Sequence, residues 1–239
     1  VAVLITSDKC YDNVEWVWGY RENDRLGGAD PYSASKGAAE LVIRSHVKSF
    51  FPKGGAVRIA VGRAGNVIGG GDWVEDRIVP DCVRSWVNEE RVELRNPHAT
   101  RPWQHVLEPL SGYLALAKEL NQNQELHGEP FNFGPLAHQN HTVLELVKDM
   151  SEHWQQVHWE DVSDTVGQPQ ESELLKLNCE KALYHLRWEA ILSFQETVRM
   201  TAEWYRSFYV NPSAMRKVTF SQIKEYETCA QSKGIQWTT

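Results

Sequence analysis

The sequence predicts an α/β protein built on a doubly wound parallel sheet. Two apolar runs, at residues 1–6 and 57–61, have the composition of strands that are buried on both faces. Between them, residues 33–50 have apolar positions at helical spacing. A strand, a helix and a second strand in this order form a parallel crossover unit. The functional groups of such a unit gather where its strands end.

The remaining elements follow from periodicity and turn residues. The first strand leads into a polar loop at residues 10–30, and the helix after it stops near the Pro-Lys-Gly-Gly turn at 52–55. A short strand at 130–134, bounded by turn residues, returns the chain to the sheet. Further helices are predicted at 75–90, 109–120, 142–155, 179–186, 194–209 and 219–231, and short strands at 157–159 and 174–177.

Composition excludes several classes of function. The 239 residues have a net charge of −7 and a pI near 5.7, which argues against a nucleic-acid partner. No run approaches the roughly 18 apolar residues of a membrane span, and no signal peptide is visible. The four cysteines are far apart in sequence, which fits a reducing cytoplasm better than a disulfide framework or a zinc site. We therefore expect a cytoplasmic protein without nucleic-acid or membrane partners.

A tyrosine and a lysine lie four residues apart at the start of the predicted helix, in the segment Asp-Pro-Tyr-Ser-Ala-Ser-Lys at 30–36. Residues at this spacing share one helix face, so Lys36 is expected near the phenol of Tyr32. The ammonium makes the phenolate accessible at neutral pH, and a tyrosine in that state is a general base. Many helices contain such a pair, so the neighbouring motifs decide its meaning.

Ser7, Asp8 and Lys9 follow the first predicted strand directly. A hydroxyl, a carboxylate and an amine at a strand end are either an ordinary polar loop or part of an active site. The expected fold brings this strand end close to Tyr32 and Lys36, which favours the active site.

Two other patterns do not predict a ligand site. The segment at 62–69 resembles a dinucleotide fingerprint, but it leads into a Gly-Gly-Asp-Trp turn, whereas a pyrophosphate site needs the N-terminus of a helix. His138 and His141 have a spacing that metal ligands can have, but no third ligand accompanies them, so a solvated loop is predicted.

Five motifs in order span most of the chain, at residues 6–13, 16–22, 30–36, 63–73 and 101–109. Together they resemble the extended short-chain dehydrogenase/reductase superfamily and, within it, the nucleotide-sugar 4,6-dehydratases. Among these, the motifs are most similar to those of enzymes that act on a cytidine diphosphate sugar. The resemblance implies NAD as cofactor, a nucleotide-diphosphate sugar as substrate, and a homodimer or homotetramer when the protein is complete.

The resemblance also implies roles for individual residues. Tyr32 is the base for the hydroxyl at carbon 4 of the sugar, and Ser7 binds the same oxygen. Lys36 holds the phenolate and the nicotinamide ribose, so Tyr32 and Lys36 are also cofactor-binding residues. The substrate-binding residues are Asn66 and Arg101, with Arg77 and His105 as weaker candidates. Arg101 suits the pyrophosphate because a guanidinium fork binds it in two places. A packed, purely structural His105 is equally consistent with the sequence.

The end of the first strand departs from the better-known dTDP-glucose enzymes, where it has the sequence Thr-Asp-Glu. Here it is Ser7-Asp8-Lys9. We assign Asp8 as the acid and Lys9 as the base of the elimination. A lysine can serve as a base only if burial or a nearby cation depresses its pKa.

The family's pattern begins upstream of Val1, and its glycine-rich phosphate loop belongs to that upstream part. We therefore expect an incomplete enzyme that contains the C-terminal part of a Rossmann-like sheet and a smaller, mostly helical substrate-binding domain. The predicted dinucleotide-binding residues are 1–65 and 105–135, and the predicted substrate-binding residues are 66–104 and 136–239. Two alternatives stay open: an epimerase or reductase of the same superfamily, and a non-catalytic nucleotide-sugar-binding fragment.

Overall fold

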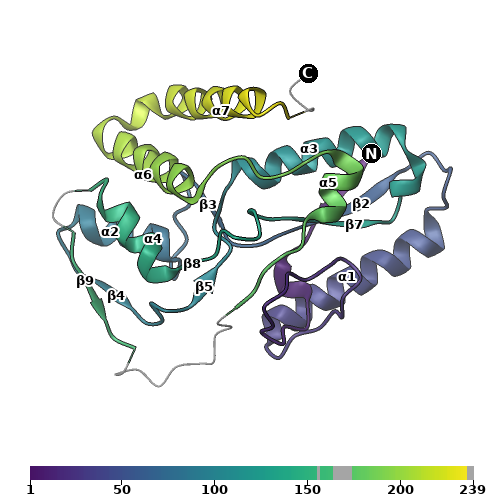
Figure 1. Cartoon of the computed structure of the whole chain (residues 1–239), viewed down its shortest axis with the longest axis horizontal. Coiled ribbons are helices and arrows are strands. Elements are labelled where there is room, and N and C mark those ends of the chain that lie inside the picture. The colour runs from purple at the N-terminus through teal and green to yellow at the C-terminus, as the bar shows by residue number, and fades with distance from the viewer. Residues whose placement is uncertain (155–156, 164–173, 236–239) are drawn as a thin grey trace.

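The computed structural model describes residues 1–154, 157–163 and 174–235. Its elements form two parts that lie next to each other (Figure 1). One part is built on a parallel sheet flanked by helices, and the other is mostly helical. The predicted α/β class is therefore confirmed. No helix among these residues has both the length and the apolar character needed to cross a bilayer.

The sheet has three parallel strands in the order β1 (Ala2–Ile5), β2 (Ile59–Ala64) and β7 (Pro130–Phe133). The register pairs Ala2 with Ile59 and Val61 with Pro130. Helix α1 (Pro31–Phe50) lies on one side of the sheet and α3 (Leu107–Gln122) on the other (Figure 1). The crossover unit predicted from the sequence is confirmed. Parallel pairing brings the carboxyl ends of the strands to one edge of the sheet.

Helix α1 begins two residues earlier than predicted. The Asp30 carboxylate caps its N-terminus by accepting hydrogen bonds from the amides of Tyr32 and Ser33, at 2.9 and 3.0 Å. Pro31 occupies the first turn, where a proline costs no hydrogen bond. The Ser33 hydroxyl also donates to Asp30 Oδ2 at 2.5 Å, and this bond, together with the two amides, holds the pKa of Asp30 below its ordinary value. The cap fixes the backbone at the residue on which the chemistry is expected to depend.

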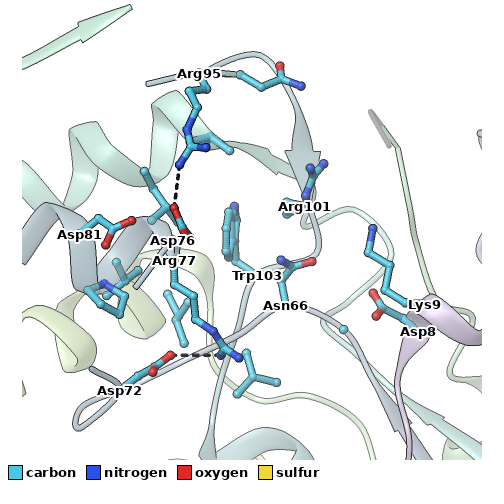
Figure 2. A pocket seen from close by; sticks show the side chains of 18 of the residues that line it. Asp8, Lys9, Asn66, Asp72, Asp76, Arg77, Asp81, Arg95, Arg101 and Trp103 are labelled. Atoms are coloured by element: carbon cyan, nitrogen blue, oxygen red, sulfur yellow. Dashed lines mark hydrogen bonds and ion pairs between the residues drawn. The ribbon is translucent and has the colours of Figure 1, made fainter. Parts of the chain in front are cut away.

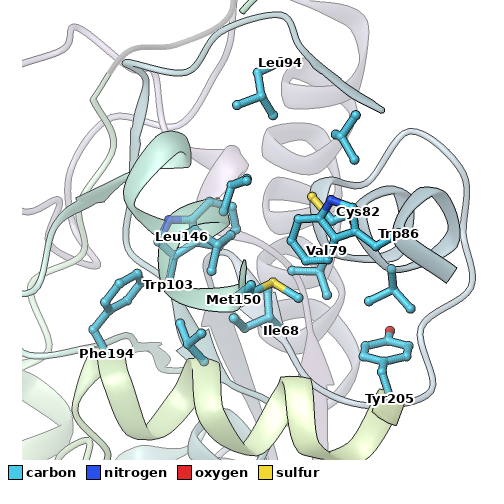
Figure 3. Packing of buried hydrophobic residues seen from close by; sticks show 14 residues of the cluster. Ile68, Val79, Cys82, Trp86, Leu94, Trp103, Leu146, Met150, Phe194 and Tyr205 are labelled. Atoms are coloured by element: carbon cyan, nitrogen blue, oxygen red, sulfur yellow. The ribbon is translucent and has the colours of Figure 1, made fainter. Parts of the chain in front are cut away.

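The second part has its own apolar core. Helices α2 (Ile78–Val87), α4 (Val143–Ser151) and α6 (Phe194–Val210) pack around it, beside the parallel strands β4 (Val92–Leu94) and β9 (Trp159–Asp161). Figure 3 shows the side chains of Trp86, Met150 and Tyr205 turned toward one another within this cluster. All three are almost completely buried. The sequence predicted a helix over each of the segments that form α2, α4 and α6, and the structure has all three.

Two-residue strands complete the architecture and were not predicted. They pair as β3 (Val67–Ile68) with β6 (Gln104–His105), and as β5 (Thr100–Arg101) with β8 (His141–Thr142). The strand predicted at 174–177 is wrong, because only Leu177 forms an isolated bridge, to Tyr20. Short 3-10 turns occur at η1 (Asp8–Cys10), η2 (Gln124–Leu126) and η3 (Pro212–Ala214).

The last helices attach to the rest through polar as well as apolar contacts. Helix α5 (Glu180–Leu186) packs on β7 and α3, and α7 (Met215–Ser232) packs on α6. The buried carboxyl group of Glu108 accepts a hydrogen bond from the Tyr226 hydroxyl of α7 at 2.8 Å. It also accepts the backbone N–H groups of Ile191 and Leu192. Glu108 thus ties α3 to the segment that precedes α6 and to the C-terminal helix α7.

Candidate active site

A cavity of about 770 Å³ opens at the carboxyl ends of β1 and β2. Side chains from both parts of the molecule line this cavity (Figure 2). Asp8 and Lys9 lie on one side of Asn66, and two arginine–aspartate ion pairs lie on the other. The sequence-predicted residues that line this cavity are Ser7, Asp8, Lys9, Tyr32, Asn66, Arg77 and Arg101.

Turn η1 presents Ser7, Asp8 and Lys9 directly after β1. The Ser7 hydroxyl caps the turn by accepting the amide N–H of Lys9 at 3.1 Å, and it donates to Asp8 Oδ1 at 3.0 Å. Asp8 is 4% exposed, and its Oδ2 has no hydrogen-bond partner among the described residues. Burial raises the pKa of Asp8 above its ordinary value, although Lys9, Ser7 and Arg101 oppose the shift. A raised pKa favours the protonated form of a carboxyl group, which is the form that can act as an acid.

Tyr32 and Lys36 lie on one face of α1, as their spacing predicts. The Lys36 Nζ atom is 5.4 Å from the centroid of the Tyr32 ring. The Tyr32 side chain is 57% exposed and lines the cavity, whereas Lys36 is half-buried and is not among the lining residues. The structure thus brings the two side chains together on one helix face, with Tyr32 at the cavity.

Asn66 and Arg101 reach the cavity through the short strands. The Asn66 carbonyl accepts the amide N–H of Gln104 at 3.0 Å, which ties the β2–β3 turn to β6. Arg101, in β5, is 9% exposed, and one of its terminal nitrogens donates to the Thr100 carbonyl at 2.9 Å. Trp103 provides an apolar wall next to both residues (Figure 2).

Arg77 stands at the N-terminus of α2 and is mostly exposed. Its guanidinium forms an ion pair with Asp72 at 3.2 Å, and nearby Arg95 pairs with Asp76 at 3.1 Å. Both pairs line the cavity, so its outer wall contains two arginines and two aspartates. Guanidinium groups that are partly exposed can exchange a carboxylate for a phosphate at modest cost, because surface ion pairs are weak.

His105 does not line the cavity. It is 2% exposed in β6, and its Nδ1 accepts the amide N–H of Leu107 at 3.3 Å. Burial lowers the pKa of His105 to about 4, so the ring is neutral at physiological pH. Of the two interpretations that the sequence allowed, the packed histidine agrees with the structure.

Sequence reasoning missed several lining residues. Asp30 had a recognisable signal, because an aspartate before a proline is a common helix start. Asp76 and Arg95 had none, because they are nineteen residues apart and meet only through the fold. Trp103 lies in the motif at 101–109 and also lines the cavity.

Comparisons with known proteins agree with this architecture. Residues 2–201 match the protein family described as GDP-mannose 4,6 dehydratase. The chain is 47% identical over 211 residues to a CDP-glucose 4,6-dehydratase of Salmonella typhimurium strain LT2. The aligned segment covers 86% of this chain and 58% of that protein. The chain therefore spans little more than half the length of this curated relative.

Solved structures show the same fold. A dTDP-glucose 4,6-dehydratase from Bacillus anthracis in complex with NAD superposes with a TM-score of 0.67 at 18% identity, covering 90% of this chain and 64% of that one. A UDP-glucuronic acid 4-epimerase from Bacillus cereus in complex with UDP-glucuronic acid and NAD gives a TM-score of 0.70 at 15% identity, covering 87% and 62%. With the family match over residues 2–201, the chain belongs to the GDP-mannose 4,6 dehydratase family of the extended short-chain dehydrogenase/reductase superfamily.

Proposed function

We propose that this chain contains the catalytic centre and the substrate site of a CDP-glucose 4,6-dehydratase. The reaction converts CDP-D-glucose to CDP-4-keto-6-deoxy-D-glucose with loss of water. The observation that supports it most is the 47% identity over 211 residues to an enzyme of that name. The clustering of Ser7, Asp8, Lys9 and Tyr32 around one cavity provides groups for both halves of the chemistry. The four free cysteines are consistent with work in the reducing cytoplasm.

Oxidation at carbon 4 is assigned to the residues on α1 and η1. Tyr32, as phenolate, removes the proton from the carbon-4 hydroxyl, and Lys36 stabilises the phenolate from one helical turn away. Ser7 hydrogen-bonds the same sugar oxygen. In the structure its hydroxyl proton points to Asp8 Oδ1, so substrate binding requires the hydroxyl to rotate toward the sugar.

Elimination across carbons 5 and 6 is assigned to Asp8 and Lys9. Once carbon 4 is a ketone, the hydrogen at carbon 5 is acidic, and Lys9 removes it. Asp8 protonates the hydroxyl that leaves carbon 6. Burial raises the pKa of Asp8, and its Oδ2 atom has no hydrogen-bond partner among the described residues. Both features suit an acid that faces the substrate. Water leaves with one hydrogen from carbon 5 and one hydroxyl from carbon 6, which balances the atoms.

The residues present fit part of an NAD site. Tyr32 and Lys36 would hold the nicotinamide end, since they share one face of α1 and Tyr32 lines the cavity. The start of α1 is not available to the cofactor pyrophosphate, because the Asp30 carboxylate already occupies its first N–H groups. When bound, NAD would accept the hydrogen of carbon 4 as hydride and return it to carbon 6. Tyr32, Asp8 and Lys9 carry out the proton transfers around that exchange.

Asn66, Arg101 and Arg77 are the proposed contacts for the sugar diphosphate. Arg101 lies deep in the cavity, and Arg77 lies at its outer wall. A pyrophosphate between them would replace Asp72 as the anionic partner of Arg77. This assignment omits His105, which is neutral and packed away from the cavity.

Substrate preference tests the proposed function directly. The complete protein that contains this chain should turn over CDP-glucose with a kcat/KM at least about tenfold above that for dTDP-, UDP- or GDP-glucose, a difference of roughly 1.4 kcal/mol. The measurement is formation of the 4-keto-6-deoxy product in parallel reactions at equal substrate concentration. A preference for dTDP-glucose would contradict the assignment.

The same reactions separate the alternatives. A 4-epimerase or a reductase, as the fold shared with UDP-glucuronic acid 4-epimerase allows, would release a sugar nucleotide without loss of water. A non-catalytic binding fragment would bind CDP-glucose and release it unchanged. The side chains of Asp8 and Lys9 favour the dehydratase, because epimerisation needs no elimination.

Gly65 should be essential for the position of the acid. A Cβ at this residue would lie 2.8 Å from Asp8 Oδ2 and 3.3 Å from Pro102 Cγ, so Gly65→Ala must displace the carboxyl group. We expect kcat to fall by about one to two orders of magnitude, the scale for a catalytic group that is misplaced by about 1 Å. A suitable control is Gly134→Ala, whose Cβ would meet its nearest atom at an ordinary 3.5 Å. Equal kcat values for the two variants would contradict the role of Asp8.

A further inference from the structure

A buried arginine joins the segments that bear the proposed catalytic residues. Arg63, near the end of β2, is 2% exposed. Its guanidinium forms a two-bond fork with the Glu40 carboxylate, with Nε–Oε1 at 2.9 Å and a terminal nitrogen–Oε2 at 2.8 Å. Glu40 is itself 4% exposed and lies on α1, one turn beyond Lys36 and two turns beyond Tyr32. The fork therefore fixes the catalytic face of α1 against β2.

The same guanidinium also holds the loop after η1. Its second terminal nitrogen donates to the Tyr11 hydroxyl at 2.8 Å and to the Glu22 carbonyl at 3.0 Å. Tyr11 directly follows the turn that contains Asp8 and Lys9. Its hydroxyl donates in turn to Asn132 Oδ1 at 2.7 Å, and burial raises the pKa of Tyr11, so the hydroxyl keeps its proton.

The Glu40 carboxylate completes the connection. It accepts a hydrogen bond from the Thr6 hydroxyl at 2.5 Å, and Thr6 is the residue before Ser7. Thr6 and Tyr11 therefore bracket the segment 7–10 on both sides. We refer to Thr6, Tyr11, Glu40 and Arg63 as the Arg63 hub. No member of the hub lines the catalytic cavity.

We propose that the Arg63 hub positions the catalytic groups on η1 relative to those on α1. Only the kinetic test of this inference depends on the proposed function. A buried ion pair adds little stability over an apolar pair of similar volume, because both charges lose their hydration. The fork instead fixes orientation. The planar guanidinium can pair with Glu40 in one orientation only, and its remaining donors hold Tyr11 at the same time. Arg63 and Glu40 are thus positioning residues, and they do not touch substrate.

The decisive variant is the double substitution Arg63→Met/Glu40→Leu in the complete protein. Apolar side chains of similar volume keep the core filled and leave no buried charge without its counter-ion, so the double variant should fold. We expect kcat for CDP-glucose to fall about 100-fold, since small misplacements of reacting groups have effects of this size. KM should change by no more than a few fold, because no substrate contact is removed. Arg199→Met/Glu225→Leu removes an ion pair between α6 and α7, away from the cavity, and serves as the control.

Hydrogen exchange provides a readout that does not depend on the substrate. In the double variant the amides of residues 8–13 should exchange about tenfold faster or more, while those of α3 keep their wild-type rates. Wild-type exchange at 8–13 together with wild-type kcat in a folded double variant would overturn the proposal. If the wild-type protein does not convert CDP-glucose, the proposed function fails, and the exchange rates still decide the role of the hub.

Arg63→Lys covers the case in which the double variant does not fold. Lysine keeps the positive charge opposite Glu40 but cannot form the fork and reach Tyr11 at the same time. We expect a folded protein with a kcat about tenfold below the wild type and with accelerated exchange at residues 8–13. Wild-type kcat and exchange in this variant would show that charge alone is needed and would overturn the positioning role.

Discussion

Replacing Tyr32 with phenylalanine should lower kcat by about two to four orders of magnitude, the range for loss of one general base. The affinity for CDP-glucose should stay within a few fold, because a single hydroxyl is removed and the proposed diphosphate contacts remain. Tyr32 is 57% exposed, so its hydroxyl does not support the core, and the melting temperature should not change. Steady-state kinetics and isothermal titration with CDP-glucose measure the two effects separately.

The matched control is Tyr184→Phe on α5, where the side chain is 72% exposed and outside the cavity. It should leave both kcat and affinity unchanged. A Tyr32→Phe enzyme with normal kcat and weakened binding would identify Tyr32 as a substrate contact and would remove it from the chemistry.

Replacing Lys9 with methionine should stop the reaction between its two halves. Methionine keeps most of the length of the side chain and removes its basicity. Oxidation at carbon 4 depends on Tyr32, Ser7 and Lys36, so a single turnover should still yield the 4-keto sugar, and the absorbance of the reduced cofactor should appear and persist. Exchange of the carbon-5 hydrogen with deuterated solvent should slow by about two orders of magnitude or more.

Two variants make the Lys9 result interpretable. Lys53→Met removes an exposed lysine, paired with Glu125, that lies outside the cavity, and it should behave as the wild type. Tyr32→Phe should slow reduction of the cofactor itself by about two to four orders of magnitude, which places its defect before that of Lys9→Met. Carbon-5 exchange at the wild-type rate in Lys9→Met would exclude Lys9 as the base and would leave Asp8 or an ordered water for that role.

Long elements with strong periodicity could be predicted from the sequence. Every boundary of strand β1, helix α1 and strand β7 lies within two residues of its predicted position, because apolar patterns and turn residues agree there. The two-residue strands could not be predicted, since they have no periodicity of their own. The segment at 174–177 failed for another reason: its partner Tyr20 lies more than 150 residues earlier, and one bridge does not make a strand.

In the candidate site, too, some residues could be predicted from local sequence and others could not. Ser7, Asp8, Lys9 and Tyr32 could be found because each follows a predicted strand or begins a predicted helix. The Arg63 hub could not be found, because nothing local distinguishes Glu40 from the solvated glutamates of an amphipathic helix. Only the fold shows that this carboxylate is buried and paired with Arg63.

Burial of the Glu108 carboxyl group makes the stability of the folded protein sensitive to pH. Burial raises the pKa of Glu108 to about 7, and its hydrogen bonds and Lys233 offset only part of this shift. A carboxyl group with a raised pKa in the folded state favours folding below its ordinary value of 4.5, and that contribution is lost as the pH rises toward 7. Near neutral pH, proton release from Glu108 leaves a charge inside the molecule at the point where α7 is anchored. The folded state should therefore lose stability as the solution becomes alkaline, although the Tyr226 hydrogen bond and Lys233 favour the charged carboxylate.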